Sequence, residues 1–478
     1  MSTAIRIAHE EWRLWLRSRM VVAAALIVAV LIAATGALTM ERLTTQAKQR
    51  AAQQEAAEAA FFAQPDRHPH RMVHYGHYAF RLPPPLSVFD PGVDMVTGQS
   101  IFLEGHRQNT AMFADAKASA NMGGFAALNP AALYQLLLPL LLIIIGHGVV
   151  LRERESGTLG VLLAQGQSAL ALAGGKALAL LGVVALFMLP LALMAAYGVA
   201  AGEAAGPAIA LVAGYGLYLM VWAALVLAVS TLVRSRSAAL GVLTACWLAM
   251  VLVVPRLGIN AASALVDAPG KIESDLVMLS QERKLGDGHN ASDPAFEQLK
   301  QDLLDQYGVE SVEELPINFR GVVASYSEEK LTGLLNEFAE RRMQSEARQS
   351  EVFGRFALAS PTLAVGAASR ALAGTDLATH HRFLRETESV RFGFVQALNE
   401  MHATKLSYID DARRSVDPEA EARTRVNAQA WAVLDRFRFA PDPPAERFAR
   451  AFGPLTLLAG WLAALAALVV YAARRLAP

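Results

Sequence analysis

Long apolar runs without a single Asp, Glu, Lys or Arg dominate this chain. Each is long enough, or nearly so, to cross a bilayer, which takes about 20 residues of helix, and a charge inside hydrocarbon would be costly. The runs are residues 20–40, 131–150, 177–201, 208–233, 238–254 and 452–473. A chain that is 54% hydrophobic and 18% charged is also too apolar for an ordinary soluble enzyme. The sequence therefore predicts an all-α membrane protein with six transmembrane helices.

Basic residues next to these spans predict how the chain is oriented. If the spans alternate in direction, the flanking arginines and lysines all fall on one side of the membrane. They lie in residues 1–19, 151–176, 234–236 and 474–475. The short loop 202–207 on the other side has Glu203 and no basic residue. Because basic flanks mark the cytoplasmic side, we expect both termini and segment 151–176 in the cytoplasm, and segments 41–130 and 255–451 outside.

The N-terminal segment 1–19 has the pattern of an amphipathic helix. Apolar residues recur at helical spacing, with arginines off that stripe; they are Ile5, Ala8, Trp12, Trp15 and Leu16. Such a helix is expected to lie in the membrane interface, with lipid as its partner and tryptophans at headgroup depth. The first span is long and lacks a clear small-x-small cleavage site, so we expect an uncleaved anchor rather than a signal peptide.

The two outer segments are expected to be mostly helical. Residues 41–62 are rich in Ala, Gln and Glu and should continue the first span as a helix, whereas the rest up to residue 130 should be irregular with short elements. In the larger segment we expect helices at 294–306, 328–358 and 378–409, with Asn318 and Gly321 in a turn. The single Cys246 excludes an intrachain disulfide, so these segments must be stabilised by apolar packing. We expect them to form one body, within a chain or across a dimer.

Segment 151–176, between the second and third spans, is the candidate functional site. Its first residues offer both signs of charge for a polar docking surface, and its leucines form an apolar face. Ser and Thr side chains can satisfy free amides at a helix start, and Gly allows a tight turn or a close approach. A solvated loop of ordinary cytoplasmic charges is the alternative. The candidate residues are Arg152, Glu153, Arg154, Glu155, Ser156, Gly157, Thr158, Leu159, Leu162 and Leu163.

Histidines gather in the first outer segment. His68, His70, His74 and His77 lie close together, and His106 follows. Imidazole binds zinc, copper and nickel, but Gly76 and nearby prolines argue against a regular helix, and no carboxylate or cysteine framework accompanies them. We therefore expect surface histidines on a loop and no metal site, although the sequence leaves the His68–His77 cluster open. The pair at 380–381 is equally unspecific.

Catalytic chemistry is not expected in this chain. A phosphate-binding loop needs G-x-x-x-x-G-K-[ST], but Gly175-Lys176 is followed by Ala177, and Leu170 stands where the first glycine belongs. The sequence has no nucleophile elbow, HExxH or paired-carboxylate motif. Net charge is zero, which gives no electrostatic case for a nucleic-acid partner. We expect no catalytic residue, no cofactor and no metal here.

Two sets of residues carry a family resemblance. Arg152-Glu-Arg-Glu-Ser-Gly-Thr-Leu159, Leu162-Leu163 and Gly175-Lys176 together resemble the cytoplasmic coupling segment of ABC-2 type transporter permeases, which have six spans, cytoplasmic termini and an amphipathic elbow helix. The pattern Leu315-Pro-Ile-Asn-Phe-Arg-Gly321, with Gly374-Thr-Asp376 and Phe383…Glu388…Arg391, resembles a branch with two large extracytoplasmic insertions, catalogued as a domain of unknown function. Gly166 stands where the family often has proline, which leaves the end of the coupling helix open.

The resemblance implies a transmembrane permease subunit of an ATP-driven transporter in a bacterial inner membrane. ATP and Mg²⁺ would bind a separate ABC ATPase subunit, and a second permease copy or a related permease would complete the path. The expected activity is export or mechanotransmission toward a periplasmic partner; the cargo cannot be derived. The alternative is a membrane-anchored assembly or sensor protein that presents helical periplasmic domains. An anchor does not need a coupling segment, which favours the permease.

Overall fold

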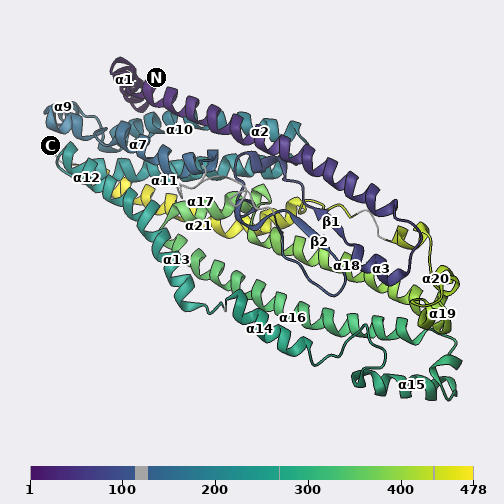
Figure 1. The fold of residues 1–478 in the computed structure, drawn as a ribbon. Coiled ribbons are helices and arrows are strands. Elements are labelled where there is room, and N and C mark those ends of the chain that lie inside the picture. Colours follow the sequence, from purple (N-terminus) through teal and green to yellow (C-terminus); the bar gives the residue numbers. More distant parts are fainter. Residues whose placement is uncertain (1, 113–127, 269, 434–436, 477–478) are drawn as a thin grey trace.

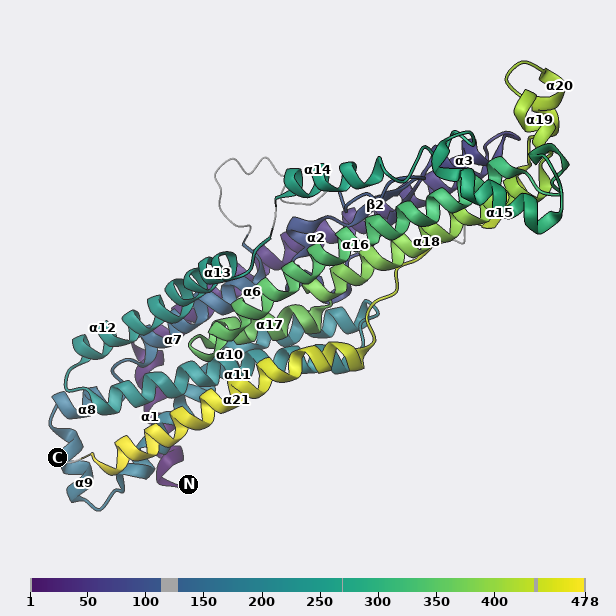
Figure 2. The ribbon, with the colours of Figure 1, turned by 90° about the horizontal axis from the view of Figure 1, so that it is seen from below.

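The computed structural model describes residues 2–112, 128–268, 270–433 and 437–476, and its long helices run roughly along one axis (Figures 1 and 2). Both chain ends lie at one end of the molecule, which we call the terminal end, beside α8 (Leu151–Glu155) and α9 (Thr158–Ala164). At the opposite, distal end lie four short helices. They are α3 (Pro69–Tyr75), α15 (Glu297–Tyr307), α19 (Tyr408–Arg413) and α20 (Pro418–Arg423).

Six helical segments of the described chain are long and apolar enough to cross a membrane. They are α2 (Met20–Phe62), the segment Pro130–Glu155 that includes α6 (Pro130–Ala132) and α7 (Leu138–Gly146), α10 (Ala169–Ala200), α11 (Ala205–Leu232), the segment Arg236–Leu265 that includes α12 (Arg236–Trp247) and α13 (Val254–Leu265), and α21 (Pro444–Arg474). Strand in the described residues is confined to one two-stranded antiparallel sheet, β1 (His77–Phe80) with β2 (Ser100–Leu103), in which His77 pairs with Leu103. The predicted all-α membrane fold with six spans is confirmed.

The N-terminal helix α1 (Thr3–Arg17) is set at an angle to the first long helix. Arg19 adopts a left-handed conformation with φ of +57°, and this turn separates α1 from α2. The buried face of α1 consists of Ala8, Glu11 and Trp15. Of the predicted apolar stripe, Ile5 and Leu16 are instead 43% and 49% exposed, because the helix divides its apolar residues between the protein and its surroundings.

A tyrosine hydroxyl forms hydrogen bonds with two backbone groups of α10 beside an interior proline. Pro190 lies inside α10, where a proline removes one hydrogen bond of the helical ladder. The hydroxyl of Tyr134 donates to the carbonyl of Phe187 at 2.7 Å and accepts from the amide of Leu191 at 3.1 Å. These two backbone groups would bond each other in a regular helix. An inserted side chain is a known cause of helix bending, and it keeps both groups satisfied away from water.

The two outer segments pack as one body, as expected. α16 (Phe319–Arg355) and α18 (Leu377–Lys405) run antiparallel, and the amide of Asn318 donates to the carbonyl of Ala403 at 2.7 Å. The first segment contributes Phe61, at the end of α2, and other apolar residues to a shared cluster with α18. Its buried members are Phe61, Met72, Val73, Phe394, Val395, Leu398, Ala430 and Trp431. α2 continues to Phe62 as a single helix, as the sequence predicts.

The prediction that Asn318 and Gly321 lie in a turn is wrong for Gly321. Asn318 caps α16 by accepting from the Arg320 amide at 3.0 Å, and Gly321 already lies within the first turn of that helix. A Cβ atom at Gly321 would lie 2.3 Å from the backbone nitrogen of Ala403. The glycine is therefore explained by the close approach of α16 to the end of α18, a contact that local sequence cannot reveal.

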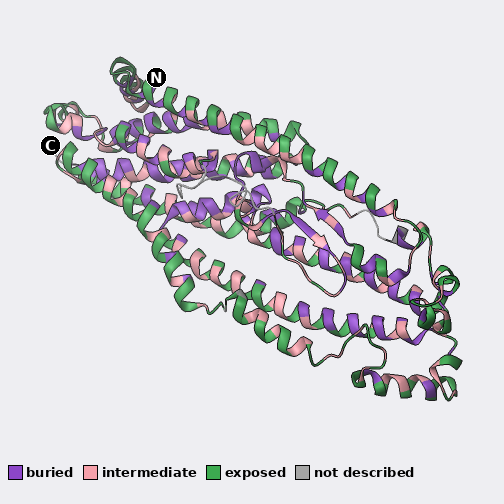
Figure 3. Cartoon of the chain, in the orientation of Figure 1, coloured by how far each residue is buried: buried purple, intermediate pink, exposed green. Residues whose placement is uncertain are grey.

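Helix α17 (Pro361–Ala373), which the sequence analysis does not predict, lies against α11 and α21. It belongs to the larger outer segment, yet it joins the same apolar core as the spans. The Tyr215 hydroxyl on α11 contacts Ser369 at 3.1 Å, and Tyr218 contacts Thr362 at 3.0 Å. Figure 3 shows buried residues concentrated along α11 and α17. The outer body therefore packs, through α17, against the membrane-spanning helices α11 and α21.

Candidate functional site

Two short helices at the terminal end hold the candidate residues. Leu151 and Leu159 are buried, and Leu162 and Leu163 pack partly buried against the same core as the spans. The apolar residues of α8 and α9 therefore pack against the bundle. The amide of Val150, just before α8, donates to the Ser230 hydroxyl of α11 at 3.0 Å. This segment is fixed to the spans rather than being a free loop.

An ion-pair cluster joins α8 to the elbow helix α1 and to α10. Arg152 contacts one carboxylate oxygen of Glu11, and the Lys176 ammonium contacts the other. Lys176 also contacts Glu153. Glu11 and Lys176 are both buried. Since buried charges require partners with complementary charge and hydrogen bonds, this cluster fixes the relative positions of the three helices.

The other two charges of α8 hold the turn between α11 and α12. The carboxylate of Glu155 accepts from the Arg236 side chain at 2.5 Å and from the Arg236 amide at 2.8 Å. The Arg154 guanidinium donates to the carbonyl of Val233 at 2.5 Å. All four charged residues of α8 thus have partners within the chain, so their charges are largely used to hold the spans together.

The turn between α8 and α9 is the exposed part of the site. Ser156, Gly157, Thr158 and Val161 are all exposed, and Val161 is 55% accessible. Gly157 has φ of +74°, a conformation that favours glycine and makes the expected tight turn. The exposed turn therefore presents mainly backbone and small side chains to any partner, and the Glu155 carboxylate next to it is already paired with Arg236.

The expectation that Ser156 and Thr158 cap a helix start is wrong. Gly157 is the N-cap of α9 and has no side chain to accept from the free amides. The hydroxyls of Ser156 and Thr158 lie 2.8 Å apart, and each lies 3.3 Å from the Glu153 carbonyl, to which each can donate. They satisfy the end of α8 instead. The sequence did not determine where the coupling helix ends. In the structure α9 ends at Ala164, before Gly166.

Glu11 is the main residue that the sequence analysis missed. It shares the buried face of α1 with Ala8 and Trp15, at spacings of three and four residues. An acidic residue on a stripe that is otherwise apolar was the available signal. Its partners, Arg152 and Lys176, lie far along the chain, and only the fold shows that they meet.

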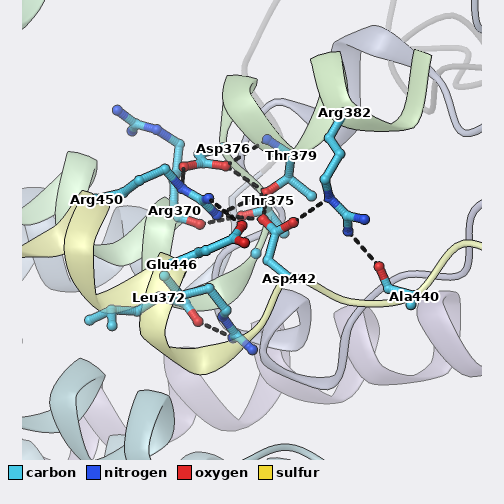
Figure 4. Close-up of polar contacts among 12 residues, drawn as sticks. Arg370, Leu372, Thr375, Asp376, Thr379, Arg382, Ala440, Asp442, Glu446 and Arg450 are labelled. Atoms are coloured by element: carbon cyan, nitrogen blue, oxygen red, sulfur yellow. Dashed lines mark hydrogen bonds and ion pairs between the residues drawn. The ribbon is translucent and has the colours of Figure 1, made fainter. Parts of the chain in front are cut away.

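A second polar cluster, which we call the base joint, links the outer body to the last span (Figure 4). Asp376 caps α18 by accepting from the Thr379 amide at 3.1 Å, and it pairs with Arg450 of α21 at 2.8 Å. Arg450 also contacts Asp442, whose other oxygen lies 2.6 Å from Arg382 of α18. The joint thus connects the first turns of α18 with the residues that lead into α21.

Asp442 is ionised in this joint. Burial alone would raise its pKa, but the Thr379 hydroxyl and the Arg450 guanidinium outweigh burial and hold the pKa of Asp442 below its usual value. A neighbouring pair extends the joint: Arg447 of α21 bonds Glu203 at 2.6 Å and also contacts the carbonyl of Leu372 at the end of α17. Glu203, in the short connection between α10 and α11, therefore meets α17 and α21 at one place.

The histidines of the first outer segment separate into different sites. His70 and His74 lie on the short helix α3, not on a loop as expected, and come close to His106 and to His289 of the larger outer segment. Burial, together with the nearby imidazoles, lowers the pKa of His70 and His74.

His68 belongs to another group. It meets His402 and Asp411, with its Nε2 lying 3.2 Å from an Asp411 oxygen, and burial lowers its pKa to about 4. His77 lies apart on β1, with its Nε2 3.5 Å from the Gln54 side chain. The His68–His77 cluster of the sequence is therefore not a single site.

Comparison with protein families identifies the chain. The model of the ABC-2 family transporter proteins matches residues 5–303, which is more than half of the chain. The chain belongs to the ABC-2 transporter family. A domain of unknown function, DUF3526, matches residues 275–440, in agreement with the suspected branch. No curated protein matches the chain significantly. This ABC-2 protein is therefore a membrane permease component of an ABC transporter, a membrane subunit that is not itself catalytic.

The residues that carried the resemblance to the DUF3526 branch hold the outer body of this ABC-2 protein together. Asn318 donates to Asp411 at 3.2 Å, and the Thr375 hydroxyl donates to the carbonyl of Asp90 at 3.0 Å. Arg391 pairs with Glu388 at 2.7 Å and with Glu328 of α16 at 2.6 Å. Asn318 and Thr375 thus join segments at helix ends, and Arg391 joins α18 to α16 from inside its helix.

Proposed function

We propose that this permease binds a separate ATPase at the exposed turn between α8 and α9 and couples its ATP hydrolysis to export or to force transmission through the outer body. The supporting observation is the combination of an exposed turn at residues 156–158, with Val161 exposed on the following helix, and an α8 that is ion-paired to its neighbours. Because Arg152, Glu153 and Glu155 pair with α1, α10 and α12, a displacement of this turn would move three helices together.

A mechanical path from this site to the outer body supports the force-transmission part of the proposal. α2 runs without interruption from Met20 to Phe62, and 43 helical residues extend about 65 Å at 1.5 Å per residue. Its end packs in the shared cluster with α18. The base joint gives a second connection, through Asp376, Asp442 and Arg450, between the last span and α18.

Placement and partners follow from the same proposal. The terminal end, with its basic residues, would face the cytoplasm of a bacterial inner membrane, and the outer body would face the periplasm. ATP and Mg²⁺ would bind the ATPase subunit. The span Arg236–Leu265 is little buried within the chain, with Leu248, Leu252 and Leu257 exposed, which fits contact with lipid or with a second permease.

The test places a charge at Val161, which is exposed on α9 next to the turn. The ATPase that co-purifies with the native chain is first identified by mass spectrometry. Val161→Glu should reduce the amount of this ATPase that co-purifies at least about tenfold, because the new carboxylate would lose its water at the interface. Val416→Glu is the matched control, since Val416 is exposed at 83% in the distal loop between α19 and α20. Reversing Glu153 or Glu155 is less informative, because it would break pairs within the chain. Unchanged co-purification and unchanged ATPase stimulation with Val161→Glu would contradict the proposal.

A further inference from the structure

Four histidines from three separate segments converge in the outer body. His70 and His74 lie one turn apart on α3, His106 lies just after β2, and His289 lies between α14 (Lys271–Glu282) and α15. One ring nitrogen from each lies within 4.8 Å of those of the other three. The Nε2 atom of His74 is 3.2 Å from that of His70 and 3.4 Å from that of His289. The first and the larger outer segments both contribute.

The arrangement of the four rings is close to tetrahedral. The six pairs of ring centroids are separated by 4.8, 5.6, 5.0, 5.1, 5.5 and 4.9 Å. In a square arrangement the diagonal pairs would be about 1.4 times as far apart as the edges, which these nearly equal values exclude. A tetrahedron of nitrogens around Zn²⁺, with bonds of about 2.0–2.1 Å, has edges of about 3.3–3.4 Å. The two measured nitrogen separations lie close to that length.

Two of the histidines are also oriented by carboxylates. Nδ1 of His106 lies 2.8 Å from the Glu328 carboxylate, and Nδ1 of His289 lies 3.2 Å from Asp287. This pairing leaves Nε2 as the free ligand atom, and carboxylate–histidine–metal arrangements are typical of protein metal sites. Nε2 of His106 is buried with no hydrogen-bond partner in the described part of the chain. A buried nitrogen without a partner is costly unless something binds it.

We propose that His70, His74, His106 and His289 bind one divalent transition-metal ion, with zinc favoured by the tetrahedral arrangement. All four ligands are imidazole nitrogens, which suit zinc and not the oxygen-seeking Ca²⁺ or Mg²⁺. Four protein ligands close the coordination shell, so the ion has a structural role. It fastens the loop that carries His289 to α3, and so ties the two outer segments together. This inference does not depend on the proposed ATPase coupling.

The neighbouring group of His68, His402 and Asp411 also has buried ring nitrogens without a hydrogen-bond partner in the described part of the chain, but it offers three ligand atoms instead of four, and its carboxylate is already paired within the chain. The Asp411 carboxylate already accepts from His402 at 2.8 Å, and Asn318 and Arg414 lie at 3.2 and 3.3 Å. Its charge is satisfied by protein donors. This group is a buried ion-pair network that joins α18 to α19, and it serves as the internal comparison for the metal site.

The experiment measures metal binding to the full-length chain, purified in detergent through a histidine-free tag and stripped with a chelator. Titration with ZnCl₂ against a chromogenic chelator should give one high-affinity Zn²⁺ per chain. Co²⁺ in the same site should give the strong visible absorption of tetrahedral cobalt. His289→Gln is the main variant, because that side chain is 52% exposed and its loss should not prevent folding.

Matched variants separate the site from the other histidines. His289→Gln and His74→Gln should each abolish the high-affinity binding of one Zn²⁺ per chain, and Asp287→Asn should weaken the Zn²⁺ affinity about 10-fold to 100-fold. His77→Gln and His402→Gln should leave it unchanged. No zinc above background, binding retained in the His289→Gln/His74→Gln double variant, or the weak absorption of octahedral cobalt would each overturn the proposal.

Discussion

Glu11 of the elbow helix and Lys176 of α10 form a buried ion pair although 165 residues separate them in the chain. Their side chains are only 2% and 1% exposed. Breaking such a pair from one side leaves an uncompensated buried charge, whereas replacing both partners with neutral groups costs far less. The pair therefore gives a direct measure of how firmly the elbow helix is attached to the spans.

The first prediction concerns this pair. Glu11→Gln should destabilise the chain in detergent by roughly 1–3 kcal/mol, since Lys176 would lose one of its two carboxylates and keep Glu153. Lys176→Met in the same background should restore most of the melting temperature, measured by fluorescence-detected size-exclusion after heating. Glu10→Gln is the control, because Glu10 pairs with Arg13 on the exposed side. Strictly additive effects of the two core substitutions would show that the residues do not interact.

The second prediction concerns the orientation of the chain. After Cys246→Ser, single cysteines at Ala60 and Ser350 should react with an impermeant thiol reagent added to intact cells. A cysteine at Ser237, in the first turn of α12, should react only after the cells are opened. All three positions are exposed in the structure, so access to the chain itself does not limit labelling. Labelling at position 237 in intact cells would contradict the proposed placement of the terminal end in the cytoplasm.

The third prediction is a pH dependence at the base joint. The folded-state pKa of Asp442 is lower than its usual value, so its ionised form contributes stability that is present near neutral pH and is lost as pH falls through the folded pKa. Asp442→Asn should therefore lower the melting temperature at pH 7, and the difference from the native chain should narrow below about pH 4. A difference that stays constant from pH 7 to pH 3 would show that Asp442 does not act through its charge.

Sequence patterns were sufficient to predict the structure of a segment wherever that structure depends on the segment alone. Uncharged apolar runs are costly anywhere but in a membrane or a core, so the six spans could be read directly. The continuation of α2 to Phe62 followed from helix propensity, and the tight turn at Gly157 from the need for positive φ. These are local properties that need no knowledge of the partner segment.

Contacts between distant segments could not be predicted in the same way. The charges of α8 looked like a docking surface, because nothing near them in sequence shows that Glu11 and Arg236 are their partners. Gly76 and the nearby prolines argued against a histidine site, and the sequence did not show that His289 of the other outer segment lies beside His70, His74 and His106. Helix α17 was missed because its small apolar residues pack among the spans, where its neighbours supply the burial.

The last prediction tests whether α2 transmits force. An insertion of six residues, Gly and Ser in alternation, after Met40 would interrupt the helix, because glycine and serine are poor helix formers and make a flexible coil. With nitroxide labels at Ser237, in α12 at the terminal end, and at Ser350, in α16 of the outer body, the assembled native transporter should show a distance change on addition of ATP and vanadate. The insertion should abolish this change while ATPase co-purification is retained.

The same six residues inserted after Val416, in the exposed turn between α19 and α20, are the control and should leave the distance change intact. The two insertions have the same length and composition, so they differ only in whether they interrupt the connection between the spans and the outer body. An unchanged nucleotide-dependent distance in the Met40 insertion would mean that α2 does not carry the movement. The outer body would then receive cargo passively, with the base joint at Asp442 and Arg450 as its main mechanical attachment.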